Sequence, residues 1–214
     1  MLKLVLDLLY PPVCGICGKI DQKELCPKCA IKLKQWEKAK LYAYPHTYFE
    51  KHFYLFPYEG IIREKLIQYK FQNQSYLSTF FAKSLLNHKK MSRILEKYDI
   101  IIPVPMYRKK EKRRGYNQTA LIARKIAKAY KNLVYDGKSL QKIKDTKMQS
   151  SLDKTERRKN IKNAYKVINQ QKIKDKKIIL LDDIYTTGST VNECSKGLKQ
   201  SGAKEILVVT IAKD

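Results

Sequence analysis

The sequence predicts an α/β fold, in which a parallel sheet carries helices on both faces and follows a small metal-binding region. Short aliphatic runs at 99–105, 178–181 and 205–212 have the length and composition of strands buried in a sheet. Helical spacing between these runs favours parallel pairing through right-handed crossovers. The 214 residues suffice for one substantial domain and a small appendage, and we expect regions 1–58 and 59–214.

The first residues predict neither export nor a membrane span. The apolar core of Met1–Pro12 is short, is interrupted by Lys3 and Asp7, and lacks a small-residue cleavage site. We therefore expect an amphipathic helix that packs against the body, no transmembrane segment and a cytoplasmic location. In a reducing compartment, regularly spaced cysteine pairs indicate a metal rather than disulfides.

Two CxxC pairs separated by eight residues lie near the amino terminus: Cys14 and Cys17, then Cys26 and Cys29. This spacing predicts a zinc knuckle, because four thiolates complete a tetrahedral shell with no open position. The Zn²⁺ would therefore be structural. A redox-active CxxC and an iron–sulfur cluster are the alternatives that remain open. Cys194 stands apart, and we expect it to be a small core residue.

The next hundred residues predict mostly helices. Residues 31–38 continue from the knuckle as a short polar helix, and the aromatic-rich stretch 42–58 predicts strands or an extended linker. Helical spacing then covers 61–69 and 77–88. The three histidines are isolated, and we interpret them as surface or packing residues: His46, His52 and His88.

A cationic segment follows the strand at 99–105, which ends because proline cannot continue a central ladder. We expect residues 106–114 to form a loop, and a helix to run from Gln118 to about Tyr130. A positive loop between a strand end and a helix start suits a pyrophosphate. The alternative is a solvated charge run. Its cations are Arg108, Lys109, Lys110, Lys112, Arg113 and Arg114.

The segment 138–177 carries 14 Lys and Arg against four Asp and Glu, with few large apolar residues before Ile161. This composition predicts an exposed and partly mobile segment. It contains the polar stretches 149–152 and 156–160. Mobile polar segments over an active site commonly act as lids.

The strongest functional signal follows the aliphatic run 178–181, where Asp182 and Asp183 arrive at the end of a buried strand. Ligands of open α/β sheets bind at the carboxyl ends of the strands. A turn with several hydroxyl groups comes next, and the helical spacing of 191–200 follows it. A phosphate in that turn would meet free amides and the positive end of a helix dipole. The pattern therefore predicts a site for a ribose bearing phosphate.

Other proteins also place paired acids after an aliphatic strand. Walker B segments and receiver-type phosphoacceptor pockets do so, and a threonine-rich turn alone is often only a helix cap. The Walker interpretation requires the loop G-x-x-x-x-G-K-[ST], and the sequence contains none.

Lys and Arg total 45 against 20 Asp and Glu, so the formal net charge is +25. This excess exceeds what solubility requires and predicts a polyanionic partner. A genome rich in A and T inflates lysine throughout its proteins, and that bias accounts for part of the excess.

The chain resembles the ComF family of competence-associated phosphoribosyltransferase-like proteins from Leu6 to about Ala212. The resemblance rests on the four-cysteine knuckle, IIPVP followed by RRGYNQ, the QSSL and ERRKN segments, and LLDDIYTTGST. It implies a Rossmann-like fold of the type I phosphoribosyltransferases preceded by a zinc-binding region. It also implies a role in natural transformation and in the handling of imported single-stranded DNA, with DNA-uptake or recombination proteins as further partners.

The resemblance also implies a ligand, phosphoribosyl pyrophosphate with Mg²⁺. The catalytic aspartates, Asp182 and Asp183, would engage the ribose hydroxyls and the hydration shell of the magnesium. The 5-phosphate would be bound by Thr186, Thr187, Gly188, Ser189 and Thr190. The pyrophosphate would be bound by Arg108, Arg113 and Arg114, with Asn117 and Gln118 fixing that loop. The flexible loop matches at Gln149, Leu152, Glu156, Arg157 and Asn160.

Two points about this family remain open in the sequence. Lys70 falls where the family has a lysine after a helix, but the glycine expected shortly afterwards is replaced by Phe71-Gln72-Asn73. No residues identify a nucleobase pocket, so the acceptor is unspecified. A phosphoribosyltransferase and a non-catalytic accessory protein that binds single-stranded DNA or senses phosphoribosyl pyrophosphate are both compatible with the sequence.

Overall fold

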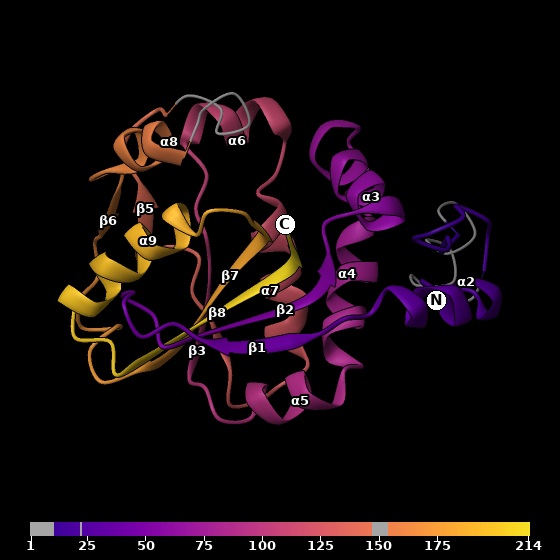
Figure 1. The fold of residues 1–214 in the computed structure, drawn as a ribbon, viewed down its shortest axis with the longest axis horizontal. Helices are drawn as coiled ribbons and strands as arrows, with labels where there is room; N and C mark the ends of the chain where they lie inside the picture. The colour runs from indigo at the N-terminus through magenta and orange to yellow at the C-terminus, as the bar shows by residue number, and fades with distance from the viewer. Residues whose placement is uncertain (1–10, 22, 147–153) are drawn as a thin grey trace, which may run out of the picture.

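The computed structural model describes residues 11–21, 23–146 and 154–214. A six-stranded sheet occupies its centre (Figure 1). All neighbouring strands are parallel except β1 and β2, which are antiparallel. The α/β prediction is therefore confirmed. The spatial order is β1 (Lys40–Ala43), β2 (Lys51–Pro57), β8 (Glu205–Lys213), β7 (Lys177–Tyr185), β3 (Ile100–Pro103) and β4 (Val134–Tyr135).

The stretch 42–58, which predicted strands or an extended linker, contains the end of β1 and all of β2. Because β2 pairs with β8 from Lys51 to Pro57, the sheet takes strands from both sides of residue 58. The division into regions 1–58 and 59–214 stays a prediction.

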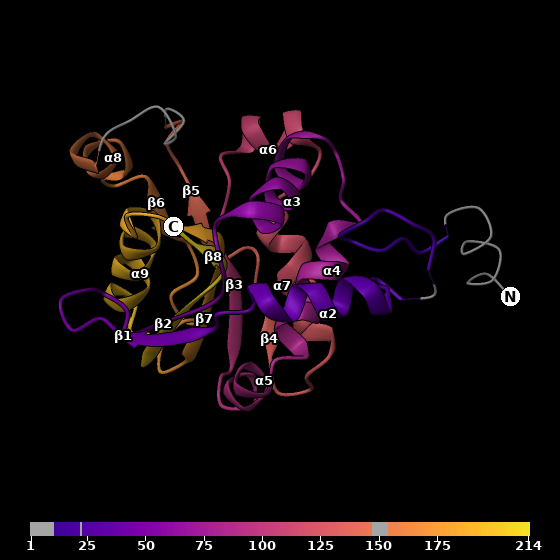
Figure 2. The same cartoon turned by 45° about the vertical axis from the view of Figure 1, so that its right-hand side comes forward.

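Helices cover both faces of the sheet, and Figure 2 shows one group on each side. On one face, aliphatic residues of the sheet pack against α3 (Gly60–Phe71), α4 (Leu77–Leu86), α5 (Lys89–Leu95) and α7 (Gln118–Lys128). On the other face, α9 (Ser189–Gln200) buries Val191, Cys194 and Leu198 against β7 and β8. Cys194 is a small core residue, as predicted.

The two neighbours of β7 end at different levels, and this difference creates an open edge. Strand β3 pairs with β7 only as far as Leu181, whereas β8 continues alongside β7 to Tyr185. The aspartates therefore lie within β7. The four aliphatic residues alone predicted a shorter strand, with the aspartates at its end. The edge of β7 that faces β3 is therefore open at Asp182 and Asp183. Pro103 and Pro105 on the β3 side offer no backbone N–H.

The predicted cationic loop at 106–114 is wrong, because residues Arg108–Arg114 form a short helix, α6. Lys, Arg and Glu are good helix formers, so a run of them needs no apolar face to become helical. Gly115 ends the helix with φ of 86°, the left-handed conformation in which glycine terminates helices.

The described parts of the segment 138–177, residues 138–146 and 154–177, contain more regular structure than the composition predicted. It contains an antiparallel pair, β5 (Leu140–Lys142) with β6 (Tyr165–Val167), and the helix α8 (Lys154–Ile161). Leu140, Ala164 and Ile173 are fully or almost fully buried. Leu140 and Ile173 belong to the same apolar cluster as the buried residues of α9 and β7.

The three histidines differ in their surroundings. His46 is exposed. His52 is fully buried. The ring of His88 accepts a hydrogen bond from the backbone N–H of Met91 and so caps α5. The helix predicted at 77–88 therefore ends at Leu86, before this cap. No helix among residues 11–21, 23–146 and 154–214 combines the length and apolar character needed to cross a bilayer.

Candidate functional site

A cleft of about 670 Å³ lies at the carboxyl ends of β3 and β7. Its floor is the end of β7 and the turn that leads into α9. One wall comes from the end of α3 and from α6, and the opposite wall comes from β5 and β6. In Figure 1, α6 and α8 lie above these strand ends. Lys110 of α6 donates a hydrogen bond to the carbonyl oxygen of Thr146, which links the two walls.

Asp182 and Asp183 face opposite sides of the sheet, because side chains alternate along a strand. Asp183 points toward α3, where the ammonium of Lys70 lies 2.9 Å from its carboxylate. Asp182 lies on the α9 face, and its Oδ1 accepts the backbone N–H of Asp183 at 2.9 Å. Burial, together with the charge of Asp183, raises the pKa of Asp182 from 3.8 to about 7.

Lys70 reaches Asp183 although the glycine expected after it is missing. Asn73 adopts φ of 53° in that position, a left-handed conformation that asparagine tolerates better than most residues. The turn after α3 therefore keeps a backbone shape that glycine would also allow.

The turn at 186–190 presents backbone and hydroxyl donors at the start of α9. Gly188 precedes the helix with φ of 72°, and the hydroxyls of Thr187 and Ser189 lie 2.9 Å apart. The helix has 12 residues, and the first amides of a helix lack partners within it. These donors and the helix dipole make the turn suitable for a phosphate.

The start of α7 fixes the wall next to β3. The side chain of Asn117 accepts hydrogen bonds from the amides of Thr119 and Ala120, at 3.0 and 3.3 Å, and donates to the carbonyl oxygen of Val104 at 3.1 Å. These contacts join the start of α7 to the end of the segment before α6, and the predicted role of Asn117 and Gln118 in fixing residues 106–114 stays a prediction. The phenol of Tyr69 donates to the carbonyl oxygen of Gln118 at 2.8 Å, so α3 and α7 are held together at the cleft.

The four cysteines of the knuckle come together as the sequence predicts. Their Sγ atoms all lie within 4.8 Å of one another, and those of Cys17 and Cys26 are 3.9 Å apart. Four sulfurs about 2.3 Å from a zinc ion would be separated by about 3.8 Å, so the residues fit this metal. Burial opposes ionisation of Cys14, but backbone amides of Cys17 and Cys26 lower the pKa of its thiol to about 6. The site is a structural zinc centre.

The knuckle is anchored to α4. Gly15 lies so close to this helix that a Cβ atom would be 2.5 Å from the ring of Phe80. Glu24 and Lys83 form an ion pair of 2.6 Å beside this contact. The helix α2 (Pro27–Trp36) continues from the second CxxC pair and buries Leu33 in the core shared with α3 and α4.

Comparisons with known proteins agree with both parts of the structure. A double zinc ribbon domain matches residues 5–40, and a phosphoribosyl transferase domain matches residues 112–214. Competence protein F of Haemophilus influenzae is 30% identical over 208 residues, which cover 94% of this chain and 85% of that protein. The chain belongs to the ComF family. Two further relatives are the DNA utilization protein YhgH of Escherichia coli, at 24% identity over 96% of this chain and 92% of that protein, and competence protein ComFC of Streptococcus pneumoniae, at 25% identity over 94% and 80%.

Among the remaining residues predicted from the ComF resemblance, some line the cleft and others do not. Arg114 lines the cleft, together with Lys110 of the same helix. Arg108 and Arg113 are exposed on α6 and do not line it. Glu156 and Asn160 lie on α8 and are not among the described residues that line the cleft. Gln149 and Leu152 lie outside the described residues, as does the side chain of Arg157.

Several residues that line the ComF cleft were not predicted from the sequence, including Lys142 and Tyr165. Lys142 of β5 and Tyr165 of β6 line the wall opposite α3, and the ammonium of Lys142 lies 5.4 Å from the centre of the Tyr165 ring. Burial and the nearby charge of Lys110 lower the pKa of Lys142, and Asp182 acts in the opposite direction. The only sequence signal was a weak alternation at 165–167 inside a highly charged segment.

Proposed function

We propose that the cleft binds phosphoribosyl pyrophosphate with Mg²⁺, and that the protein acts in the cytoplasm in the use of imported DNA. The observation that carries this proposal is the meeting of two acids and a phosphate-binding turn at one open strand end. The names of the relatives, competence protein and DNA utilization protein, support the biological context. They do not identify the ligand.

Each part of the cleft has a role in this proposal. Asp182 and Asp183 hold the ribose hydroxyls and the hydration shell of the magnesium, because carboxylate oxygens suit this hard cation. Residues 186–190 bind the 5-phosphate through amides and hydroxyls. Lys110 and Arg114, which line the wall of α6, face the pyrophosphate with Lys70. Arg108 and Arg113 would add only longer-range attraction from their exposed positions.

Phosphoribosyl transfer removes pyrophosphate from the anomeric carbon while positive charge develops on the ribose ring. This chemistry needs positioning and electrostatic stabilisation rather than a nucleophilic side chain. The acids would stabilise the ring, and the cations of α3 and α6 would stabilise the leaving group. Magnesium, when bound, neutralises the phosphate oxygens. The acceptor stays open, so binding and turnover are tested separately.

The test of binding is calorimetry with phosphoribosyl pyrophosphate and Mg²⁺. We expect wild-type protein to bind, and Asp182→Asn with Asp183→Asn to abolish the heat of binding. Asp175→Asn is the control, because Asp175 is exposed and its φ of 61° suits asparagine. Unaltered magnesium-dependent binding by the double variant would refute the assignment of the site. A screen for pyrophosphate release over free bases then separates a transferase from a sensor.

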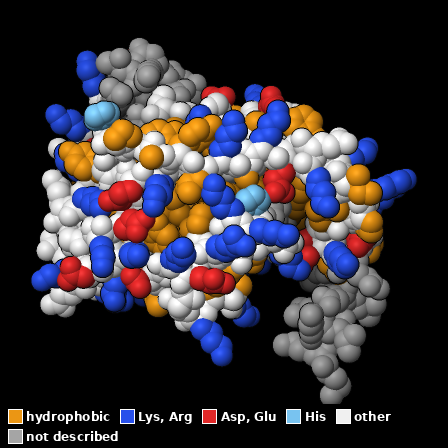
Figure 3. Space-filling model, turned by 60° about the horizontal axis from the view of Figure 1, so that its bottom comes forward, with side chains coloured by type: hydrophobic (Ala, Val, Ile, Leu, Met, Phe, Trp, Pro, Cys, Tyr) orange, Lys and Arg blue, Asp and Glu red, His pale blue; other side chains and the backbone are white. Residues whose placement is uncertain are grey.

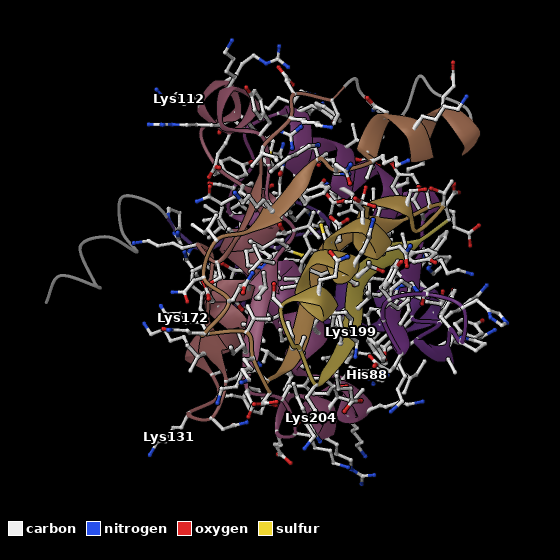
Figure 4. The ribbon with its side chains drawn as sticks, turned by 90° about the vertical axis from the view of Figure 1, so that its left-hand side faces the viewer. His88, Lys112, Lys131, Lys172, Lys199 and Lys204 are labelled. Carbon is white, nitrogen blue, oxygen red and sulfur yellow. The ribbon has the colours of Figure 1, made fainter. Side chains whose placement is uncertain are left out.

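A second candidate function, binding of single-stranded DNA, is favoured by the distribution of charge. On the face in Figure 3, Lys and Arg side chains are spread among fewer acidic ones. Lys112, Lys131 and Lys172 lie along one side of the molecule in Figure 4 and make no ion pair with the described residues.

Salt dependence tests this second function. Each phosphate contact contributes about 0.7 to the slope of log affinity against log salt for a single strand. Replacing Lys109 and Lys112 by Met should lower the slope, whereas the aspartate double variant should leave DNA binding nearly intact. An unchanged slope would remove α6 from the DNA-binding surface.

A further inference from the structure

The phosphate-binding turn rests on a buried tyrosine. Tyr185 is the last residue of β7 and is only 8% exposed. A Cβ atom on Gly188 would lie 2.3 Å from its hydroxyl oxygen and 2.6 Å from the adjacent ring carbon. The phenol therefore occupies the space that a side chain at Gly188 would need. Position 188 is restricted to glycine by this contact as well as by its φ of 72°.

A buried histidine holds this tyrosine in place. The ring of His52 stacks on Tyr185 with centroids 4.2 Å apart and planes at 23°. Tyr44 packs beside both rings, 5.8 Å from Tyr185 and 6.0 Å from His52. Burial lowers the pKa of His52 to about 3, so its ring is neutral and can stack without a buried charge.

The stack continues into the sheet through a polar contact. Nε2 of His52 lies 2.9 Å from the hydroxyl oxygen of Thr210, which is fully buried on β8. Thr210 pairs in register with Asp182, and their side chains share the α9 face. Tyr185 therefore connects the turn to the two strands β2 and β8 beside the acids. The contact with Thr210 also orients the imidazole, whose Nδ1 has no hydrogen-bond partner among the described residues.

We propose that Tyr185 and His52 are positioning residues, which hold residues 186–190 in the conformation that binds a phosphate monoester. Glycine is the residue with the greatest backbone freedom, so a turn centred on Gly188 needs an external contact to fix its amides. A fixed set of donors binds more tightly because less conformational entropy is lost when the ligand arrives. This inference rests on the proposed function of the turn.

The test separates the two halves of the ligand. Tyr185→Leu is titrated with ribose 5-phosphate, which uses the turn, and with magnesium pyrophosphate, which does not. We expect affinity for ribose 5-phosphate to fall about tenfold, and affinity for magnesium pyrophosphate to remain at the wild-type value. Tyr185→Phe keeps the ring, and its affinity for ribose 5-phosphate should fall less than that of Tyr185→Leu.

Tyr98→Leu is the matched control. Tyr98 is also buried, at 6% exposed, and its hydroxyl donates to Glu205 at the opposite end of β8. This variant should lose stability while both affinities stay unchanged. His52→Phe preserves a ring against Tyr185 and should bind ribose 5-phosphate better than His52→Leu does.

The outcomes distinguish this inference from the proposed function. If wild-type protein binds neither probe, the proposed function fails. If wild-type protein binds ribose 5-phosphate and Tyr185→Leu binds it equally well, the positioning role is overturned. An equal loss of both affinities in Tyr185→Leu would also overturn it, because that result indicates a general disturbance of the cleft.

Discussion

Asp182→Asn is expected to stabilise the ligand-free protein above pH 7. Burial and the neighbouring charge of Asp183 raise the pKa of Asp182 to about 7, so its ionised form is disfavoured in the folded state. Below about pH 4 the carboxyl is protonated in both the folded and the unfolded chain, and it resembles asparagine. Between about pH 4 and 7 the unfolded chain releases this proton while the folded chain still holds it, so the free energy of unfolding falls as pH rises and levels off above 7. Asparagine has no such loss.

The magnitude follows from the difference between about 7 and the ordinary value of 3.8. At 1.36 kcal/mol per pH unit, this difference corresponds to roughly 4 kcal/mol as an upper limit. Solvent in the open cleft screens the charge, and Lys142 offsets part of the cost. We therefore expect Asp182→Asn to raise the free energy of unfolding by about 1–2 kcal/mol at pH 8.

The assay is urea denaturation between pH 4 and 9 in magnesium-free buffer, with Asp136→Asn as a control of opposite sign. Although Asp136 is buried, hydrogen bonds from the hydroxyl and amide of Ser139 and the amide of Lys138 lower its pKa. Its stabilising effect is present at neutral pH and is lost in acid, so Asp136→Asn should destabilise at pH 7. The reasoning would be refuted if Asp182→Asn did not raise the free energy of unfolding at pH 8. It would also be refuted if that increase did not become smaller below pH 5.

Three further predictions concern the supporting structure. Asn117→Ala removes the cap of α7 and should lower the free energy of unfolding by about 1–2 kcal/mol in urea; an unchanged midpoint would show that the cap contributes nothing. Gly15→Ala places a methyl group 2.5 Å from Phe80 and should cost about 1–3 kcal/mol. The control Gly197→Ala meets only Val167, at 3.7 Å, and should stabilise by about 0.5–1 kcal/mol, so equal effects would contradict the close contact. Removal of zinc should expose the amides of residues 11–36 to hydrogen exchange while β7 stays protected, and simultaneous loss of protection in β7 would show that the sheet depends on the metal.

Sequence reasoning succeeded where the information is local. The aliphatic run before Asp182, the hydroxyl-rich turn and the CxxC spacing each lie within a few consecutive residues. The helix predicted at 61–69 and the strand predicted at 205–212 were found within two residues of their ends. Such patterns report the period and the local chemistry of one element, and these do not depend on its neighbours.

Sequence reasoning failed where contacts join distant elements. Lys142 and Tyr165 meet Asp182 only because β5 and β6 fold back over the end of β7. The stack of His52 on Tyr185 joins residues more than 130 positions apart. The helix α6 was missed for a different reason, since a run of charged residues has neither an apolar face nor a strand period to mark it.

The two adjacent aspartates show how the fold separates two similar groups. Because side chains alternate across a strand, Asp183 reaches Lys70 on one face, while Asp182 faces the α9 side near Lys142 and Thr210. Only Asp183 has an ion pair at 2.9 Å, and Asp182 keeps the raised pKa. A sugar with a magnesium ion would supply Asp182 with a positive charge and hydroxyl donors, whereas no described residue forms an ion pair with it. The predicted gain in stability of Asp182→Asn and the proposed affinity for the ligand therefore share one physical cause, a half-buried carboxylate with no ion pair among the described residues.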